Sequence, residues 1–237
     1  MERHETGIFV QDRLFTLQGN SSTYQMKVDG YGYLLHCYYG RKACGDMSFL
    51  MLAKDRAFSP NPYDAGDDTS YSLDSLPQEF PVSGNGDFRS SCFDVVYEDS
   101  SWGLDLRYKE HRVLDGLAAI PGLPAVYSDD AVRDGAQTLQ LVLEDAAAGL
   151  EVTLSYGLLP RLDVITRTVS VTNVGTKTVT IKKLQSACID FVAGDYDLLK
   201  FYGRHAMERN LERSAIGQNG ENDLGVVHVH LADRKST

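Results

Sequence analysis

The stretch Thr138-Leu-Gln-Leu-Val-Leu-Glu-Asp145 places an apolar residue at every second position, and Leu150-Glu-Val-Thr-Leu-Ser-Tyr156 repeats the pattern. Successive side chains of a β-strand point to opposite faces, so this period predicts two strands that are each buried on one face. The intervening Ala147-Ala-Gly149 can reverse the chain, which makes the pair a hairpin. The residues expected on the buried faces are Leu139, Leu141, Leu143, Leu150, Val152, Leu154 and Tyr156.

The same period continues along the chain on both sides of this hairpin. Asp163–Thr172 is rich in β-branched residues, and Asn173-Val-Gly175 separates it from Thr178–Ile181. Only Ala206–Arg213 suggests a helix, of about two turns. Many strands with short connections predict an all-β fold, namely a large antiparallel β-sandwich. Further segments with strand character are Leu14–Gln18, Tyr24–Val28, Tyr33–Tyr39, Cys92–Tyr97 and Trp102–Val113.

One long segment, residues 59–91, interrupts this regularity. It contains four prolines and several glycines and shows little strand pattern. Loops of this length inside a compact domain are usually functional or disordered. The apolar and aromatic residues of the segment argue against disorder, because disordered chains are poor in them. We therefore expect an ordered excursion that packs against the rest of the fold.

Composition excludes several classes of function. The 237 residues include 33 Asp and Glu against 23 Lys and Arg, for a net charge of −10. Binding to a nucleic-acid backbone requires clustered cations, so no nucleic acid is expected as a partner. No apolar run approaches the roughly 18 residues that span a bilayer, so no membrane is expected either. The charged start Met1–Asp12 lacks the apolar core of a signal peptide, and together these features predict a cytoplasmic protein.

Cysteines and histidines give no sign of a metal site. The four cysteines are scattered, and although Cys37 and Cys44 could face each other, neutral thiols in a reducing compartment are the favoured interpretation. His228 and His230 share a strand face, but zinc needs three or four ligands and no third ligand is near. We expect no metal and no cofactor.

The sequence contains no motif that is sufficient by itself to indicate catalysis. Gly84-Asn-Gly-Asp-Phe-Arg89 superficially resembles a phosphate loop but lacks the required lysine, and a turn that leads into a strand explains it better. Four carboxylates, Asp55, Asp74, Glu79 and Asp87, lie in or near the irregular segment. Glycoside hydrolysis requires two carboxylates that face one sugar bond. The sequence does not show such convergence, and solvated loop acids are the commoner case.

An ordered series of motifs, spread over residues 10–214, resembles the N-terminal domain of bacterial α-galactosidases of glycoside hydrolase family 36. The series matches the family in order and without large gaps, which makes it more specific than any single motif. The matching segments are Arg56–Pro62, Ser72–Phe80, Gly84–Arg89, Leu104–Lys109, Pro121–Pro124, Gly149–Tyr156, Asp163–Arg167, Asp195–Leu199 and Glu208–Arg213.

The resemblance implies a β-supersandwich over residues 1–214, followed by a divergent tail at 215–237. Enzymes of this family resemble retaining α-galactosidases that act on terminal α-galactosides of the melibiose and raffinose type. Their nucleophile and acid/base are aspartates of a (β/α)₈ barrel, whose sites gather at the carboxyl ends of the strands. A chain of 237 residues is too short for both units. We therefore expect a truncated part of an enzyme, with no catalytic residue of its own and no activity alone.

The resemblance also implies one substrate-binding residue and one partner. Members of this kind resemble tetramers in which a loop of the N-terminal domain reaches a neighbour's active site. The corresponding loop predicts a homo-oligomer through residues 55–89, with α-galactoside bound only in the full-length enzyme. Asp55 aligns with an acidic residue of the sugar pocket, although a surface pair with Arg56 explains it equally well. For Asp87 and Arg89, a buried ion pair that braces the loop is expected.

Two other classes of function remain open. Sandwich domains often bind sugars on an exposed aromatic platform, and Trp102 with the tyrosine-rich segment 31–39 could form one. The chain would then be a stand-alone carbohydrate-binding module. The second alternative is a domain that serves assembly alone.

Overall fold

The computed structural model describes residues 5–51, 62–68, 70–120, 135–190 and 195–216. The chain divides into two compact units, Met1–Asp190 and Phe191–Thr237. Among the described residues the only helices are three single 3-10 turns: η1 (Ser48–Leu50), η2 (Tyr63–Ala65) and η3 (Pro160–Leu162). All other regular structure is β, which confirms the predicted all-β class.

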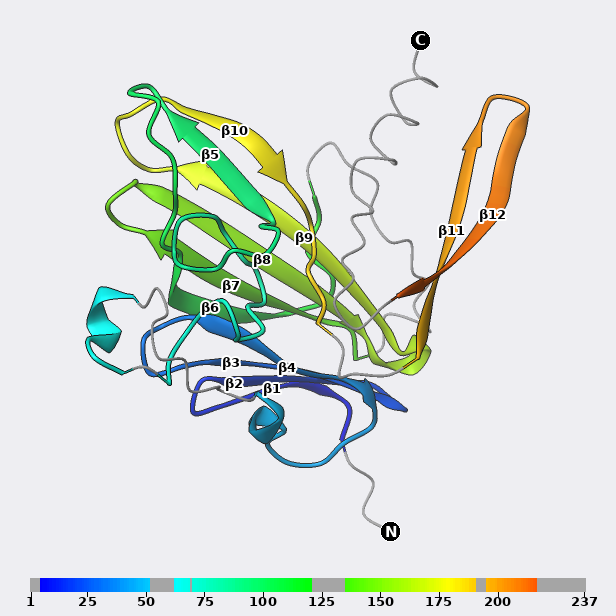
Figure 1. Ribbon diagram of the computed structural model, residues 1–237. Helices are drawn as coiled ribbons and strands as arrows, with labels where there is room; N and C mark the ends of the chain where they lie inside the picture. The colour runs from blue at the N-terminus through cyan, green and yellow to red at the C-terminus, as the bar shows by residue number, and fades with distance from the viewer. Residues whose placement is uncertain (1–4, 52–61, 69, 121–134, 191–194, 217–237) are drawn as a thin grey trace. The chain divides into compact units, whose positions relative to one another are not determined.

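The first unit contains two four-stranded antiparallel sheets and one antiparallel pair (Figure 1). In each sheet the strands follow chain order, as expected for consecutive hairpins. The first sheet consists of β1 (Gly7–Gln11), β2 (Leu14–Gln18), β3 (Ser22–Val28) and β4 (Leu34–Arg41). The second consists of β6 (Arg107–Asp115), β7 (Gln137–Asp145), β8 (Leu150–Leu159) and β9 (Val164–Asn173). The pair consists of β5 (Phe93–Tyr97) and β10 (Val179–Leu184).

The hairpin β7–β8 has the register that its sequence pattern predicts. Leu141 lies opposite Leu154 and Leu143 lies opposite Val152. All seven residues expected on the buried faces are at most 3% exposed. Residues of the first sheet, such as Phe15 and Met26, belong to the same apolar cluster. The two sheets therefore pack face to face as a sandwich, which confirms the predicted architecture.

The long segment before β5 is ordered where the structure describes it, as predicted. Tyr71, Leu73 and Leu76 are buried in a second apolar cluster together with Tyr33 and Leu35 of the first sheet and its preceding turn. Isolated β-bridges connect the segment to the strands of the sandwich, between Leu35 and Gln78 and between Val82 and Phe93. The segment is thus a packed part of the first unit.

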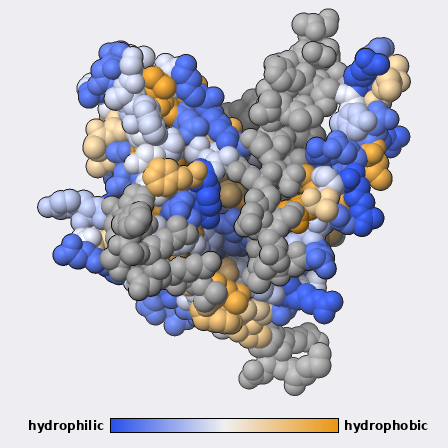
Figure 2. Space-filling model, in the orientation of Figure 1, coloured by the Kyte–Doolittle hydropathy of each residue, from blue (hydrophilic) through white to orange (hydrophobic). Residues whose placement is uncertain are grey.

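The second unit contains a hairpin of β11 (Tyr196–Arg204) and β12 (Met207–Ile216). The two helical turns that Ala206–Arg213 could have formed are therefore absent, and the segment is a strand. β12 pairs with β11 along almost its whole length, and this pairing overrides a weak helical pattern. Figure 2 shows hydrophobic side chains between hydrophilic ones on this hairpin, where Leu199, Phe201 and Leu211 are more than half exposed.

None of the described helices is long and apolar enough to cross a bilayer. The predicted boundary at residue 214 lies within the second unit, and the tail 217–237 lies outside the described residues.

Candidate functional site

The centre of the first unit contains a buried carboxylate, Glu79, that is 0% exposed. Its Oε1 accepts hydrogen bonds from the hydroxyl of Tyr24 at 2.6 Å and from that of Tyr156 at 2.8 Å. The same oxygen accepts one from Nη1 of Arg167 at 2.7 Å, while Nδ1 of His36 lies 3.1 Å from Oε2. Tyr24 and His36 come from β3 and β4, whereas Tyr156 and Arg167 come from β8 and β9. Glu79 therefore joins the two sheets of the sandwich.

Arg167 is the ion-pair partner that makes this burial tolerable. Its guanidinium also donates from Nη2 to the backbone carbonyl of Glu79 at 2.9 Å and lies over the Tyr156 ring, 5.1 Å from the centroid. Burial alone would raise the pKa of the Glu79 carboxyl, but Arg167 and the hydrogen bonds from His36 and Tyr24 lower it below its usual value. Glu79 is thus held ionised. A fully enclosed carboxylate that is ionised at neutral pH is suited to joining elements and not to proton transfer.

Sequence reasoning placed Glu79 among solvated loop acids, and that interpretation is wrong. Its partners are 43 to 88 residues away in the sequence, so no local pattern identifies them. One signal was available: Glu79 and Arg167 both lie in segments that carried the family resemblance.

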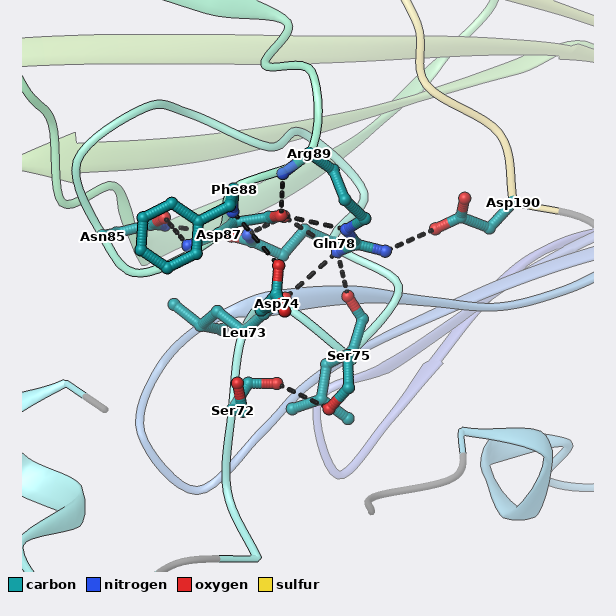
Figure 3. A network of polar contacts seen from close by, with 11 residues as sticks. Ser72, Leu73, Asp74, Ser75, Gln78, Asn85, Asp87, Phe88, Arg89 and Asp190 are labelled. Carbon is teal, nitrogen blue, oxygen red and sulfur yellow. Dashed lines mark hydrogen bonds and ion pairs between the residues drawn. The ribbon is translucent and has the colours of Figure 1, made fainter. Parts of the chain in front are cut away.

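A second polar network fixes the end of the long loop (Figure 3). Arg89 donates from Nε to Asp87 Oδ1 at 2.9 Å and from Nη2 to Asp87 Oδ2 at 2.8 Å. Nη2 also contacts the carbonyls of Leu73 and Leu76, and Nη1 lies 3.8 Å from Asp190. Asp87 is 6% exposed. The predicted bracing ion pair is present, but it is buried only at Asp87, because the Arg89 side chain is 40% exposed. The pair ties three separate segments together.

A third network holds the other described part of the loop. Arg107 of β6 pairs with Asp105 at 2.9 Å and with Asp64 of η2. Its guanidinium also donates to the carbonyl of Tyr31 at 3.0 Å and lies 4.8 Å from the ring centroid of Tyr33. η2 immediately follows residues 52–61. These residues lie outside the described part of the chain, and Asp55, the predicted substrate contact, is one of them.

The surface next to the second network is hollowed. Phe88, Arg89, Asp94, Trp102 and other residues line a hollow of about 500 Å³. Phe88 is 79% exposed and Trp102 is 68% exposed. No residue of the segment 31–39 lines this hollow with Trp102. Tyr33, Leu35 and Cys37 are buried in the core, whereas Tyr39 is 41% exposed. Within the described residues no three His, Cys, Asp or Glu side chains are placed to hold a metal ion.

The fold is an antiparallel β-sandwich domain, and its long loop is held in place by the contacts of Arg89 and Arg107. Residues 32–222 match the model of the glycosyl hydrolase family 36 N-terminal domain. The chain belongs to this family.

Relatives of this chain are α-galactosidases of much greater length. It is 49% identical over 205 residues to the bifunctional α-galactosidase/sucrose kinase AgaSK of Mediterraneibacter gnavus, a match that covers 86% of this chain and 22% of that protein. It is 41% identical over 209 residues to α-galactosidase AgaA of Geobacillus stearothermophilus, covering 87% and 28%. The solved galactosidase domain of AgaSK superimposes with a TM-score of 0.83 at 47% identity, covering 89% of this chain and 29% of that one. The chain thus spans about a quarter of the length of these relatives.

Proposed function

We propose that this chain is the N-terminal domain of a retaining α-galactosidase for terminal α-galactosides, with no catalysis of its own. Its loop 55–89 forms a homo-oligomer interface and contributes Asp55 to the rim of an active site. We expect the domain to require neither a metal nor a cofactor. The protein acts in the cytoplasm, in agreement with its four free cysteines.

The observation that carries the rim role is the double anchoring of the long loop. Arg107 holds η2 on one side and Arg89 holds residues 73–76 on the other. A substrate-contacting loop must be positioned by rigid neighbours to be effective. The exposed rings of Tyr63, 98% accessible, and Phe88 provide apolar surface for a neighbouring chain.

The absence of independent catalysis is tested with the chain itself. We expect no hydrolysis of a chromogenic α-galactoside at high protein concentration. Hydrolysis that persists through repeated purification steps, at constant specific activity, contradicts this part of the proposal.

The role of Asp55 is tested in a chimera in which residues 1–214 replace the matched part of AgaA. A carboxylate that accepts hydrogen bonds from sugar hydroxyls contributes about 1.5–3 kcal/mol, so Asp55→Asn should lower kcat/KM for raffinose roughly 10- to 100-fold. The matched control is Asp67→Asn, because Asp67 is an exposed acid of the same loop. Equal kcat/KM for the Asp55 variant and the unaltered chimera refutes the substrate contact.

The hollow beside Trp102 favours a second candidate, a carbohydrate-binding module. Aromatic faces bordered by polar side chains are suited to sugars, which present both C–H groups and hydroxyls. Titration calorimetry of the chain with galactose, melibiose and raffinose distinguishes the two functions. Millimolar or tighter binding that Trp102→Ala abolishes favours the module, whereas no heat of binding leaves the enzyme-domain proposal.

A further inference from the structure

The hollow beside the second network is lined by cations as well as by aromatic rings. The described residues that line it include the cations Arg89, Lys182 and Lys183 and the carboxylate Asp94. The whole chain carries a net charge of −10, so this surface has the opposite balance of charge. A concave surface on which one sign of charge prevails concentrates ligands of the other sign. The hollow is therefore suited to an anion.

A β-bulge brings the two lysines to the same hollow. Adjacent residues of a regular strand point to opposite faces of the sheet. In the β5–β10 pair, Ile181 lies opposite Val95 and Lys183 lies opposite Asp94, so Lys182 is an extra residue of β10. Bulges re-aim side chains and often occur next to functional sites. Both lysines therefore line the hollow although they are neighbours in the chain.

The walls of the hollow are held in place by contacts within the first unit. Trp102 forms an isolated bridge with Val96 of β5. Arg89 is fixed by its two hydrogen bonds to Asp87 (Figure 3). Because Asp87 already neutralises Arg89, this guanidinium serves as a wall, and the two lysines supply the charge for a ligand. A site that is formed before its ligand arrives has a lower entropy cost of binding.

The lining residues indicate the chemical class of the ligand. Lysine ammonium groups bind phosphate as point charges, and each can donate three hydrogen bonds. Ser83 and Ser90 line the same hollow, and their hydroxyls can donate to further phosphate oxygens. The exposed rings of Phe88 and Trp102 provide an apolar surface for the C–H groups of a sugar. The volume of about 500 Å³ falls within the roughly 300–1,000 Å³ of small-ligand sites.

We propose that this hollow binds a sugar phosphate, with the phosphate at Lys182 and Lys183 and the sugar ring against Trp102. The proposal rests on the second candidate function for the contact with the ring, and it adds the charge of the ligand. It is independent of the enzyme-domain function, which the hydrolysis assay tests separately.

The experiment titrates the full chain with galactose 6-phosphate, galactose and inorganic phosphate by calorimetry at low salt. We expect galactose 6-phosphate to bind with a Kd of about 1 mM or tighter. Galactose and inorganic phosphate should each bind at least about tenfold more weakly, because each makes only part of the contacts. Binding of galactose 6-phosphate should weaken as salt is added, since salt screens exposed charges.

A charge-removing variant and its matched control test the lysines. Lys182→Gln should raise the Kd for galactose 6-phosphate about tenfold, because it removes a charge from the phosphate contact. Lys182 is exposed, so this variant should fold. The control is Lys177→Gln, which removes the same charge from an exposed lysine that does not line the hollow. It should leave the Kd unchanged.

A second variant tests the contact with the ring. Trp102→Ala should weaken the binding of galactose 6-phosphate and leave that of inorganic phosphate unchanged. Its circular dichroism spectrum reports whether it folds, and Lys182→Gln remains decisive if it does not.

Four results overturn the proposal. Equal Kd values for galactose and galactose 6-phosphate exclude the phosphate contact and leave the carbohydrate-binding module of the second candidate function. Equal Kd values for inorganic phosphate and galactose 6-phosphate exclude the ring contact. No binding of galactose 6-phosphate, or equal effects of Lys182→Gln and Lys177→Gln, excludes the site itself. The outcome of the hydrolysis assay is unaffected by any of these results, so a failure here is distinct from a failure of the enzyme-domain proposal.

Discussion

At the residue scale, Glu79 joins the two sheets of the sandwich through buried polar contacts. A charge moved out of water costs several kcal/mol unless partners replace its hydration. Glu79 has four side-chain partners, and among described residues the only buried side-chain polar atom without a hydrogen bond is Nε of Arg167. The network is therefore almost fully satisfied.

Replacing Glu79 by glutamine should destabilise the protein severely. Glu79→Gln keeps the volume but leaves Arg167 buried without a counter-charge, and loss of one partner of a buried pair costs about 3–5 kcal/mol. Urea denaturation measures the change. Glu98→Gln, at an exposed position, is the control and should stay within about 0.5 kcal/mol. A loss below 1 kcal/mol at Glu79 would show that the pair contributes little.

The difference in unfolding free energy between the wild type and Glu79→Gln should depend on pH. Because the pKa of Glu79 is lowered in the folded protein, its contribution is complete above the unfolded value of about 4.3 and disappears as pH falls through the folded value. The difference in stability between the wild type and Glu79→Gln should be widest at neutral pH and should narrow below about pH 4.

Individual residues were predictable where their partners are local. Asp87 and Arg89 are two residues apart, so their ion pair could be expected from sequence. The contacts of Glu79 depend on how distant strands pack, and periodicity carries no information on that. Asp55 stays a prediction, because it lies outside the described residues.

At the scale of elements, strand prediction succeeded where one face is buried. β7 and β8 alternate because each presents one face to the core, and β2 has the predicted bounds Leu14–Gln18. β11 and β12 are largely exposed on both faces, so burial does not require apolar and polar residues to alternate along them. The sequence of β12 therefore showed a weak helical pattern in place of a strand pattern. Pairing alone defines that hairpin.

One connection depends on a close approach of two backbones. Gly84 has a φ of +101°, and a Cβ at this position would lie 2.6 Å from the Cα of Gly103. Gly84→Ala should therefore lose about 2–5 kcal/mol of stability through steric overlap and backbone strain, measured by urea denaturation. Gly30→Ala is the control, since a Cβ there meets nothing within 4 Å. Equal midpoints for the two variants would contradict the close approach.

At the scale of the whole molecule, the proposed interface gives a prediction about assembly. Tyr63 is 98% exposed and lies in the 55–89 loop, so Tyr63→Arg should weaken self-association at least about tenfold by adding a charge to an apolar contact. Phe49→Arg is the control, because Phe49 is 67% exposed outside that loop. Light scattering over a dilution series measures both. If both variants associate equally, the interface lies elsewhere.

The reach of the Glu79 network also determines when the fold can be completed. Its contacts span 43 to 88 residues, and those with Tyr156 and Arg167 can form only after β8 and β9 have been brought to the first sheet. Contacts of long sequence separation form late, because loop closure must precede them. We expect φ-values near zero for conservative changes of the network, which would accelerate unfolding and leave the refolding rate nearly unchanged. The residue that joins the sheets would then slow the unfolding of the domain and leave its folding rate unchanged.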